Sequence, residues 1–218
     1  MSSRHNVLFE NDILNSSSTV LELGCGVSGI VALAIGARIG KYIATDQDYA
    51  LKLLKQNIAC NAAKSADPDQ QKSRRNRNTQ KKATKATDPD NIQVMALDWE
   101  LDSLHTLPDL LKAGHGSLPG SDMEVVDAVV ACDCIYNEAL VEPFVTTCAE
   151  ICRLRGNKPE SRSTVCIVAQ QLRSPEVFET WLVAFHAAFH VWRLPDNLLT
   201  ESLKQNSGFV VHIGTLKT

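Results

Sequence analysis

The sequence lacks any run of about 18 apolar residues, and its first residues lack the charged and apolar regions of a secretion signal. These absences argue against a membrane-spanning helix and predict a soluble intracellular protein with no membrane partner. Aromatic residues are also scarce, at 6% of the 218 residues, but 44% of the residues are hydrophobic, which suffices for one large core. A single domain over residues 1–218 is therefore expected.

Metal-binding patterns are missing as well. The seven cysteines include no CxxC pair, and the histidines are scattered without ligand spacing. An odd number of cysteines, most of them in apolar segments, favours reduced and buried thiols over a disulfide framework. We therefore expect no metal site.

Large apolar residues are absent between Asn61 and Asn91, where no Val, Ile, Leu, Met, Phe, Trp or Tyr occurs. Such a segment cannot bury enough surface to offset the ordering of its backbone, so residues 62–90 are predicted to form a disordered basic insertion. Its basic run, 72–85, is a candidate for weak RNA contact or a nuclear signal, although a solvated loop is the favoured reading. The rest of the chain is acidic, which favours basic acceptors.

What the sequence contains is an alternation of short apolar runs and helical periodicity, typical of a parallel α/β sheet. Only about fourteen residues separate the last two predicted strands, with no good helical stripe between them, so these strands should form an antiparallel hairpin. The expected fold is a Rossmann-like, mostly parallel seven-stranded sheet with helices on both faces. The predicted strands are Thr19–Leu23, Lys41–Thr45, Ile92–Ala96, Val125–Cys132, Ser163–Ala169, His190–Leu194 and Phe209–Leu216, and the predicted helices are 28–38, 48–61, 101–112, 138–154 and 175–188.

A glycine-rich turn follows the first predicted strand. Gly24, Gly26 and Gly29 stand between that strand and a helix, where missing Cβ atoms let the backbone approach a ligand and the helix N-terminus offers free N–H groups. Glu22 precedes the turn, and its carboxylate suits a ligand with an ammonium and a sulfonium better than a pyrophosphate. A purely structural turn is the alternative.

Acidic residues also end the next two predicted strands. Asp46 is placed to accept both ribose hydroxyls of an adenosine, whereas nearby Asp48 is better explained as a helix N-cap. Asp98 can accept the adenine amine and Trp99 can cover its ring, although an ordinary surface aspartate is the competing explanation.

The fourth predicted strand ends in Cys132, Asp133 and Tyr136, where the most buried strand should open into a cleft. Cys132 is expected beside the cofactor. Asp133 and Tyr136 would face the group transferred, with Asp133 holding an acceptor amine and Tyr136 lining its channel. A core position for Tyr136 is the alternative.

These motifs, in this order, resemble the family-16 branch of seven-strand protein methyltransferases, and residues 20–30 and 199–214 resemble its fungal ribosomal lysine methyltransferase 5 subgroup. The resemblance implies the cofactor S-adenosylmethionine, methylation of a lysine in a large-subunit ribosomal protein, and a cytoplasmic location. It also implies a longer segment with helices and a Trp before the first strand. Here 18 residues precede Thr19, so the chain is expected to be shortened at its N-terminus.

Two other functions are compatible with the pattern. A NAD-type oxidoreductase would share the glycine turn, but Glu22 and the terminal hairpin argue against it. A non-catalytic ribosome-associated binding module would keep the fold without the reaction. A monomer is expected in either case.

Overall fold

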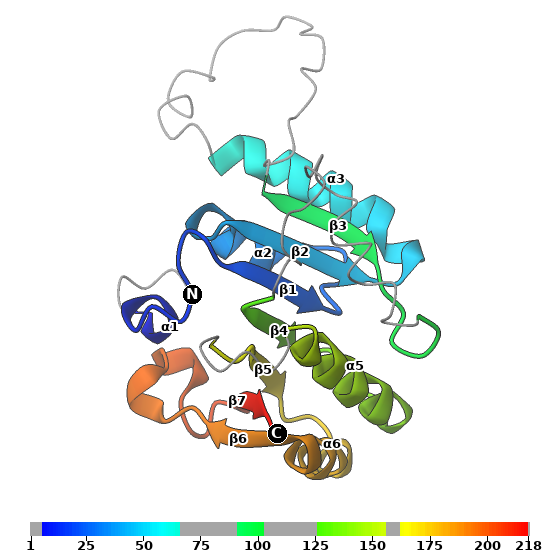
Figure 1. Ribbon diagram of the computed structural model, residues 1–218, viewed down its shortest axis with the longest axis vertical. Coiled ribbons are helices and arrows are strands. Elements are labelled where there is room, and N and C mark those ends of the chain that lie inside the picture. The colour runs from blue at the N-terminus through cyan, green and yellow to red at the C-terminus, as the bar shows by residue number, and fades with distance from the viewer. Residues whose placement is uncertain (1–5, 66–90, 103–125, 156–161, 218) are drawn as a thin grey trace, which may run out of the picture.

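The computed structural model describes residues 6–65, 91–102, 126–155 and 162–217 (Figure 1). The predicted helix over 101–112 and the basic run 72–85 fall largely or wholly outside these ranges. Among the described helices, none combines the length and apolar character that a membrane crossing requires.

A seven-stranded sheet organises the described residues, in the order β3-β2-β1-β4-β5-β7-β6. The pairs among β1 to β5 are parallel, whereas β7 runs antiparallel to both β5 and β6. The predicted fold class and its C-terminal hairpin are thus confirmed. The strands are β1 (Thr19–Leu23), β2 (Lys41–Asp46), β3 (Ile92–Ala96), β4 (Ala128–Cys132), β5 (Val165–Gln171), β6 (Phe189–Arg193) and β7 (Phe209–Leu216).

Helices cover both faces of this sheet, as Figure 1 shows. Strand residues alternate between the faces, so Val20 and Tyr42 pack with the α2 and α3 side, whereas Leu21 and Ile43 belong to the core under α5 and α6. The helical elements are α1 (Val7–Glu10), α2 (Ile30–Ile35), η1 (Gly36–Arg38), α3 (Asp48–Ser65), η4 (Glu138–Leu140), α5 (Val141–Arg153), α6 (Pro175–Ala188), η5 (Asp196–Leu198) and η6 (Glu201–Leu203).

Several boundaries differ from those predicted. Helix α3 continues to Ser65, four residues into the segment expected to be disordered, and it begins at Asp48, which is therefore its first residue and not an N-cap. Strand β4 begins at Ala128, three residues later than predicted, and Asp127 just before it binds the Thr19 N–H and Arg155 through its side chain. Ser18, just before β1, is buried and accepts a hydrogen bond from the Asn15 N–H through its hydroxyl.

Because β1 to β5 are parallel, their carboxyl ends meet at one edge of the sheet. The glycine turn leaves β1 there, and the polar residues predicted after β2, β3 and β4 leave at the same edge. In open α/β sheets this edge is where ligands bind.

Candidate active site

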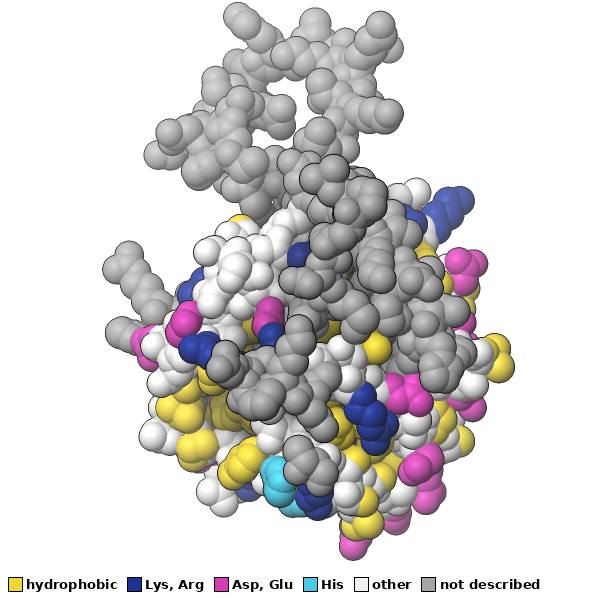
Figure 2. Space-filling model, in the orientation of Figure 1, with side chains coloured by type: hydrophobic (Ala, Val, Ile, Leu, Met, Phe, Trp, Pro, Cys, Tyr) yellow, Lys and Arg dark blue, Asp and Glu magenta, His cyan; other side chains and the backbone are white. Residues whose placement is uncertain are grey.

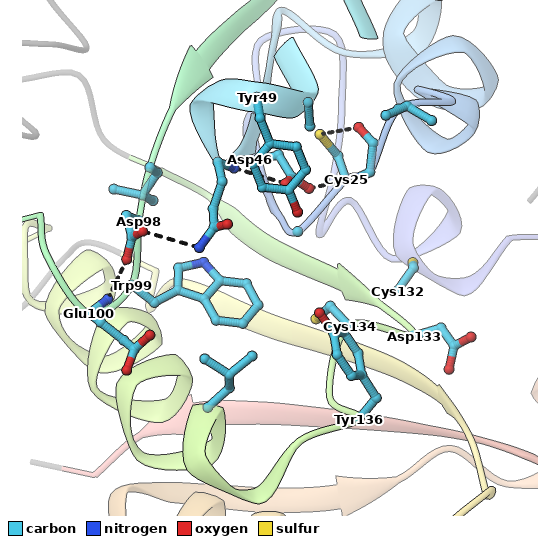
Figure 3. A pocket seen from close by; sticks show the side chains of 17 residues that line it. Cys25, Asp46, Tyr49, Asp98, Trp99, Glu100, Cys132, Asp133, Cys134 and Tyr136 are labelled. Carbon is cyan, nitrogen blue, oxygen red and sulfur yellow. Dashed lines mark hydrogen bonds between the residues drawn. The ribbon is translucent and has the colours of Figure 1, made fainter. Parts of the chain in front are cut away.

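A cavity of about 430 Å³ opens at the carboxyl ends of β1 to β4 (Figure 3). Its lining comes from loops that are far apart in the sequence. Of the nine residues predicted for the site, all except Glu22 line it: Gly24, Gly26, Asp46, Asp98, Trp99, Cys132, Asp133 and Tyr136. The topology therefore brings the predicted residues together.

The glycine turn has a left-handed backbone at three positions, with φ of 63° at Gly24, 64° at Gly26 and 60° at Gly29. A Cβ on Gly24 would lie 2.8 Å from the Cys134 Cβ and 3.2 Å from Trp99 Cζ2, so a side chain cannot fit. A Cβ on Gly26 would meet no atom within 4 Å. The turn is therefore packed tightly at Gly24 and open at Gly26, where a ligand could approach the backbone.

Asp46 fixes this turn from the neighbouring strand. Its Oδ2 accepts a hydrogen bond of 2.7 Å from the Gly26 N–H, and its Oδ1 accepts one of 2.8 Å from the Gln47 N–H. Each oxygen keeps further acceptor capacity toward the cavity. The carboxylate can therefore shape the turn and still receive hydroxyl donors.

Asp98 and Trp99 form the opposite wall. Asp98 accepts the Glu100 N–H at 2.9 Å within its own loop and the Gln47 side-chain amide at 3.1 Å from the loop after β2. The Trp99 indole packs edge-on against Phe144, with 5.3 Å between ring centroids. Figure 3 shows the indole projecting between Asp98 and Cys134, where it presents a flat apolar surface to the cavity.

Glu22 lies beneath the turn and does not line the cavity. Its side chain is buried, and its Oε2 accepts a hydrogen bond of 2.7 Å from the Tyr42 hydroxyl. Burial raises the pKa of the Glu22 carboxyl to about 7, the Tyr42 hydrogen bond opposes this rise, and the charge of Asp46 adds to it. Direct contact between Glu22 and a ligand therefore stays a prediction.

The thiols near the cavity are poor nucleophiles. Burial raises the pKa of the Cys132 thiol to about 12, with further contributions from Glu22 and Asp133. All seven cysteines are free, and among the described residues no group of three or more metal-ligating side chains is arranged around a common point. Cys132 thus offers a neutral, polarisable wall.

Asp133 and Tyr136 stand at the mouth, on the loop after β4. Asp133 has a left-handed backbone, with φ of 57°, and its N–H donates to the Ala169 carbonyl at 2.8 Å. Figure 3 shows its carboxylate directed away from Trp99 and Asp98. Tyr136 is 69% exposed, so the alternative of a core position is wrong.

Arg173 is a charged neighbour that sequence reasoning missed. Its guanidinium forms an ion pair with Asp133, and its Nε–H donates to the Gln171 side-chain oxygen at 2.8 Å. Arg173 follows β5, the neighbour of β4, so its position at the same sheet edge is the one signal that could have identified it.

A second, smaller cavity of about 130 Å³ shares Asp133 and Tyr136 with the first. Ile135 of the same loop also lines it, and the remaining lining residues come from the end of β5 to the start of α6, among them Gln170, Arg173 and Val177. The loop after β4 is therefore a wall common to both cavities.

Known proteins resemble this chain in sequence and in fold. A model of a family described as lysine methyltransferase matches residues 9–113. Ribosomal lysine N-methyltransferase 5 of Candida glabrata is 30% identical over 82% of this chain and 51% of its own length, and the protein of that name from Zygosaccharomyces rouxii is 30% identical over 77% and 50%. The chain thus spans about half the length of these curated relatives.

A solved methyltransferase from Pyrococcus furiosus shares the fold, with a TM-score of 0.52 and 11% identity over 95% of this chain and 79% of that one. The glycine turn, Asp46, Asp98 and Trp99 all lie inside the stretch that the family model matches. Over residues 9–113, therefore, the chain is similar to a family described as lysine methyltransferase.

Proposed function

We propose that this protein is an S-adenosylmethionine-dependent protein-lysine N-methyltransferase that acts on a ribosomal protein. The observation that carries this proposal is one cavity that joins an open glycine turn, two strand-end carboxylates and an indole to the exposed pair Asp133 and Tyr136. The family match and the printed names of the relatives support the reaction and the class of acceptor.

The residues present fit an adenosyl cofactor. The turn at Gly26 leaves its backbone unobstructed, Asp46 retains acceptor capacity for ribose hydroxyls, and Asp98 with Trp99 would hold the adenine. When bound, S-adenosylmethionine supplies a methyl group on a sulfonium: the sulfur keeps the electron pair of the broken S–CH3 bond, an N–CH3 bond forms, and the amine proton leaves to solvent. Glu22, close beneath the turn, would provide negative charge toward the cationic end of the cofactor.

The residues of the chain itself would mainly position the acceptor lysine and exclude water from it. A lysine of ordinary pKa must lose a proton before it can react, which costs about 4.6 kcal/mol at pH 7. Asp133 would orient the amine, Tyr136 would line its path, and the thiol of Cys132 and the indole of Trp99 would limit water at the reacting end. No general base is required if the proton leaves before attack.

Three further features belong to the same proposal. The relatives' name points to a ribosomal acceptor, and we extend it to a large-subunit protein methylated in the cytoplasm. The basic run 72–85 is a candidate for weak RNA contact or nuclear import. We also propose that the protein works as a monomer. Gel filtration with light scattering would test the last point, and a dimer would overturn it.

The central test is Asp133→Asn, with the exposed Glu179→Gln on α6 as a charge-matched control. We expect radiolabelled methyl transfer into yeast large ribosomal subunits to fall by about 100-fold or more in Asp133→Asn, because one transition-state contact of this kind is worth about 3 kcal/mol. Calorimetric affinity for S-adenosylhomocysteine should stay within about twofold. Full activity of Asp133→Asn would contradict the assigned role.

A further inference from the structure

Asp133 and Arg173 form an ion pair at the wall shared by the two cavities. Asp133 binds the Arg173 guanidinium, and its Oδ1 also lies 3.4 Å from the Gln171 N–H. Arg173 is held in turn by the Gln171 side-chain oxygen at 2.8 Å. The guanidinium therefore lies beside the carboxylate that would meet the acceptor.

This arrangement resolves an electrostatic conflict in the proposed reaction. A carboxylate alone favours the charged form of a nearby lysine, which raises the pKa of that amine and holds it in the unreactive state. A second positive charge at the same place has the opposite effect, because it disfavours protonation of the amine. A carboxylate paired with an arginine can thus accept a hydrogen bond from a neutral amine without retaining an ammonium.

We propose that Arg173 is a positioning residue that neutralises Asp133, so that the acceptor lysine is received in the small cavity as a free amine and an alkylammonium is disfavoured. This inference rests on the proposed lysine methylation. Of the described residues that line the small cavity, Asp133 and Arg173 carry charge and Tyr136 can ionise.

Two other acidic side chains, from α6 and η4, have hydroxyl partners of their own. Glu176, in the first turn of α6, lies 3.4 Å from the Ser174 hydroxyl, and Glu138 of η4 lies 3.4 Å from the Thr180 hydroxyl on α6. Neither lines the small cavity. Arg173 is therefore the described cation best placed to compete with an incoming ammonium for Asp133.

The pair is also exposed enough to exchange partners. The side chains of Asp133 and Arg173 are 40% and 55% exposed, and ion pairs in such settings hold together weakly. A neutral amine can therefore approach the free side of the carboxylate and share it with the guanidinium without breaking a buried interaction.

The first test uses n-butylammonium as a probe of the acceptor site and does not depend on activity. Amide shifts of Asp133 and Gln171 would be followed by nuclear magnetic resonance in the full chain, in Arg173→Gln, and in Arg162→Gln, which removes a comparable exposed pair with Asp12. We expect Arg173→Gln to bind the probe about three- to tenfold more tightly than the unmodified protein, with Arg162→Gln unchanged. Equal affinity in both variants would overturn the proposal.

Two more variants separate charge from structure. Arg173→Lys keeps the cation and should restore the weak binding, whereas the double variant with Asp133→Asn should lose the gain in affinity. The neutral probe n-butanol should bind all variants alike. If Arg173→Lys binds n-butylammonium as tightly as Arg173→Gln does, the role of the cation is wrong.

The second test follows methyl transfer into yeast large ribosomal subunits against pH. Arg173→Gln should lower KM for the acceptor, lower kcat at neutral pH, and move the rising limb of the kcat profile up by about 0.5 to 1 pH unit. A merely structural role would lower Tm and leave that limb in place. Inactivity of the unmodified protein would refute the methyltransferase proposal, while the butylammonium titration would still decide the role of Arg173.

Discussion

Strand β4 is flanked by two aspartates, and each is paired with an arginine. Asp127, at the amino end, binds Arg155, and Asp133, at the carboxyl end, binds Arg173. The two pairs have the same chemistry and lie at the two ends of one strand, but their surroundings differ. The Asp127 side chain also accepts a hydrogen bond of 2.8 Å from the Thr19 N–H, and the Asp127 N–H donates one of 2.8 Å to the Thr19 carbonyl.

The difference in exposure indicates that the two ion pairs have different roles. At the amino end the side chains of Arg155 and Asp127 are only 14% and 27% exposed, so the pair joins β4, β1 and the end of α5. At the carboxyl end the pair is exposed, and Asp133 adopts a left-handed backbone that an ordinary residue avoids. Because an exposed ion pair stabilises little, the pair at the carboxyl end is expected to add little to the stability of the fold.

The largest effect on stability is expected from Gly24→Ala, at the carboxyl end of the sheet. The new Cβ would meet Cys134 and Trp99 and would sit in a left-handed backbone, so we expect unfolding free energy to fall by about 3 kcal/mol. Denaturation in guanidinium chloride would measure it. Gly26→Ala is the matched control, because it has the same φ with open space around it and should cost only about 1 kcal/mol.

Equal losses in the two glycine variants would contradict the tight packing at Gly24. They would indicate that backbone strain alone sets the cost, and that the cavity wall formed by Trp99 can move aside. The carboxyl end of the sheet would then be less rigid than its contacts suggest.

A second prediction concerns the buried acid under the cavity. Because the pKa of Glu22 is raised to about 7, the folded protein binds its proton more tightly than the unfolded chain does. Stability from this group is therefore fully present below about pH 4.5 and is lost as pH rises through 7. Glu22→Gln cannot ionise, so it should gain about 2 kcal/mol over the unmodified protein between pH 5 and pH 8.

Urea unfolding at pH 5, 6.5 and 8 would check this difference, with Glu100→Gln as an exposed control that should show no such trend. A difference between Glu22→Gln and the unmodified protein that stays flat with pH would contradict the raised pKa. Bound S-adenosylhomocysteine, which carries an ammonium, should reduce the difference if Glu22 supplies charge to the cofactor.

Much of this site could be predicted from sequence, because it depends on order along the chain. Gly24 and Asp46 each follow a short apolar run, and parallel strands bring their ends to one edge whatever lies between them. The antiparallel hairpin was also predictable, because the link before β7 carries no helical periodicity that would form a crossover helix.

The missed features depend on side chains that meet across the sheet. Arg173 reaches Asp133 over 40 positions of sequence, and Tyr42 reaches Glu22 from the neighbouring strand. No periodic pattern in the sequence predicts such contacts between side chains on different strands. The alternation of β1 places Glu22 on the α2 and α3 side of the sheet, where Tyr42 binds it, and its contact with a ligand stays a prediction.

The smallest effect on stability compares the two ion pairs directly, through a change from Asp to Asn at each end of β4. Asp127→Asn loses the charge that binds Arg155 and weakens the acceptor for the Thr19 N–H, so we expect about 1.5 kcal/mol less stability. Asp133→Asn should change stability by less than about 0.5 kcal/mol, because its pair is exposed and Asn tolerates a left-handed backbone. Methyl transfer should show the reverse order, with activity lost in Asp133→Asn and kept in Asp127→Asn. Chemical denaturation and the transfer assay on the same preparations would measure both, and a variant that loses stability and activity together at the carboxyl end would show that Asp133 serves the fold after all.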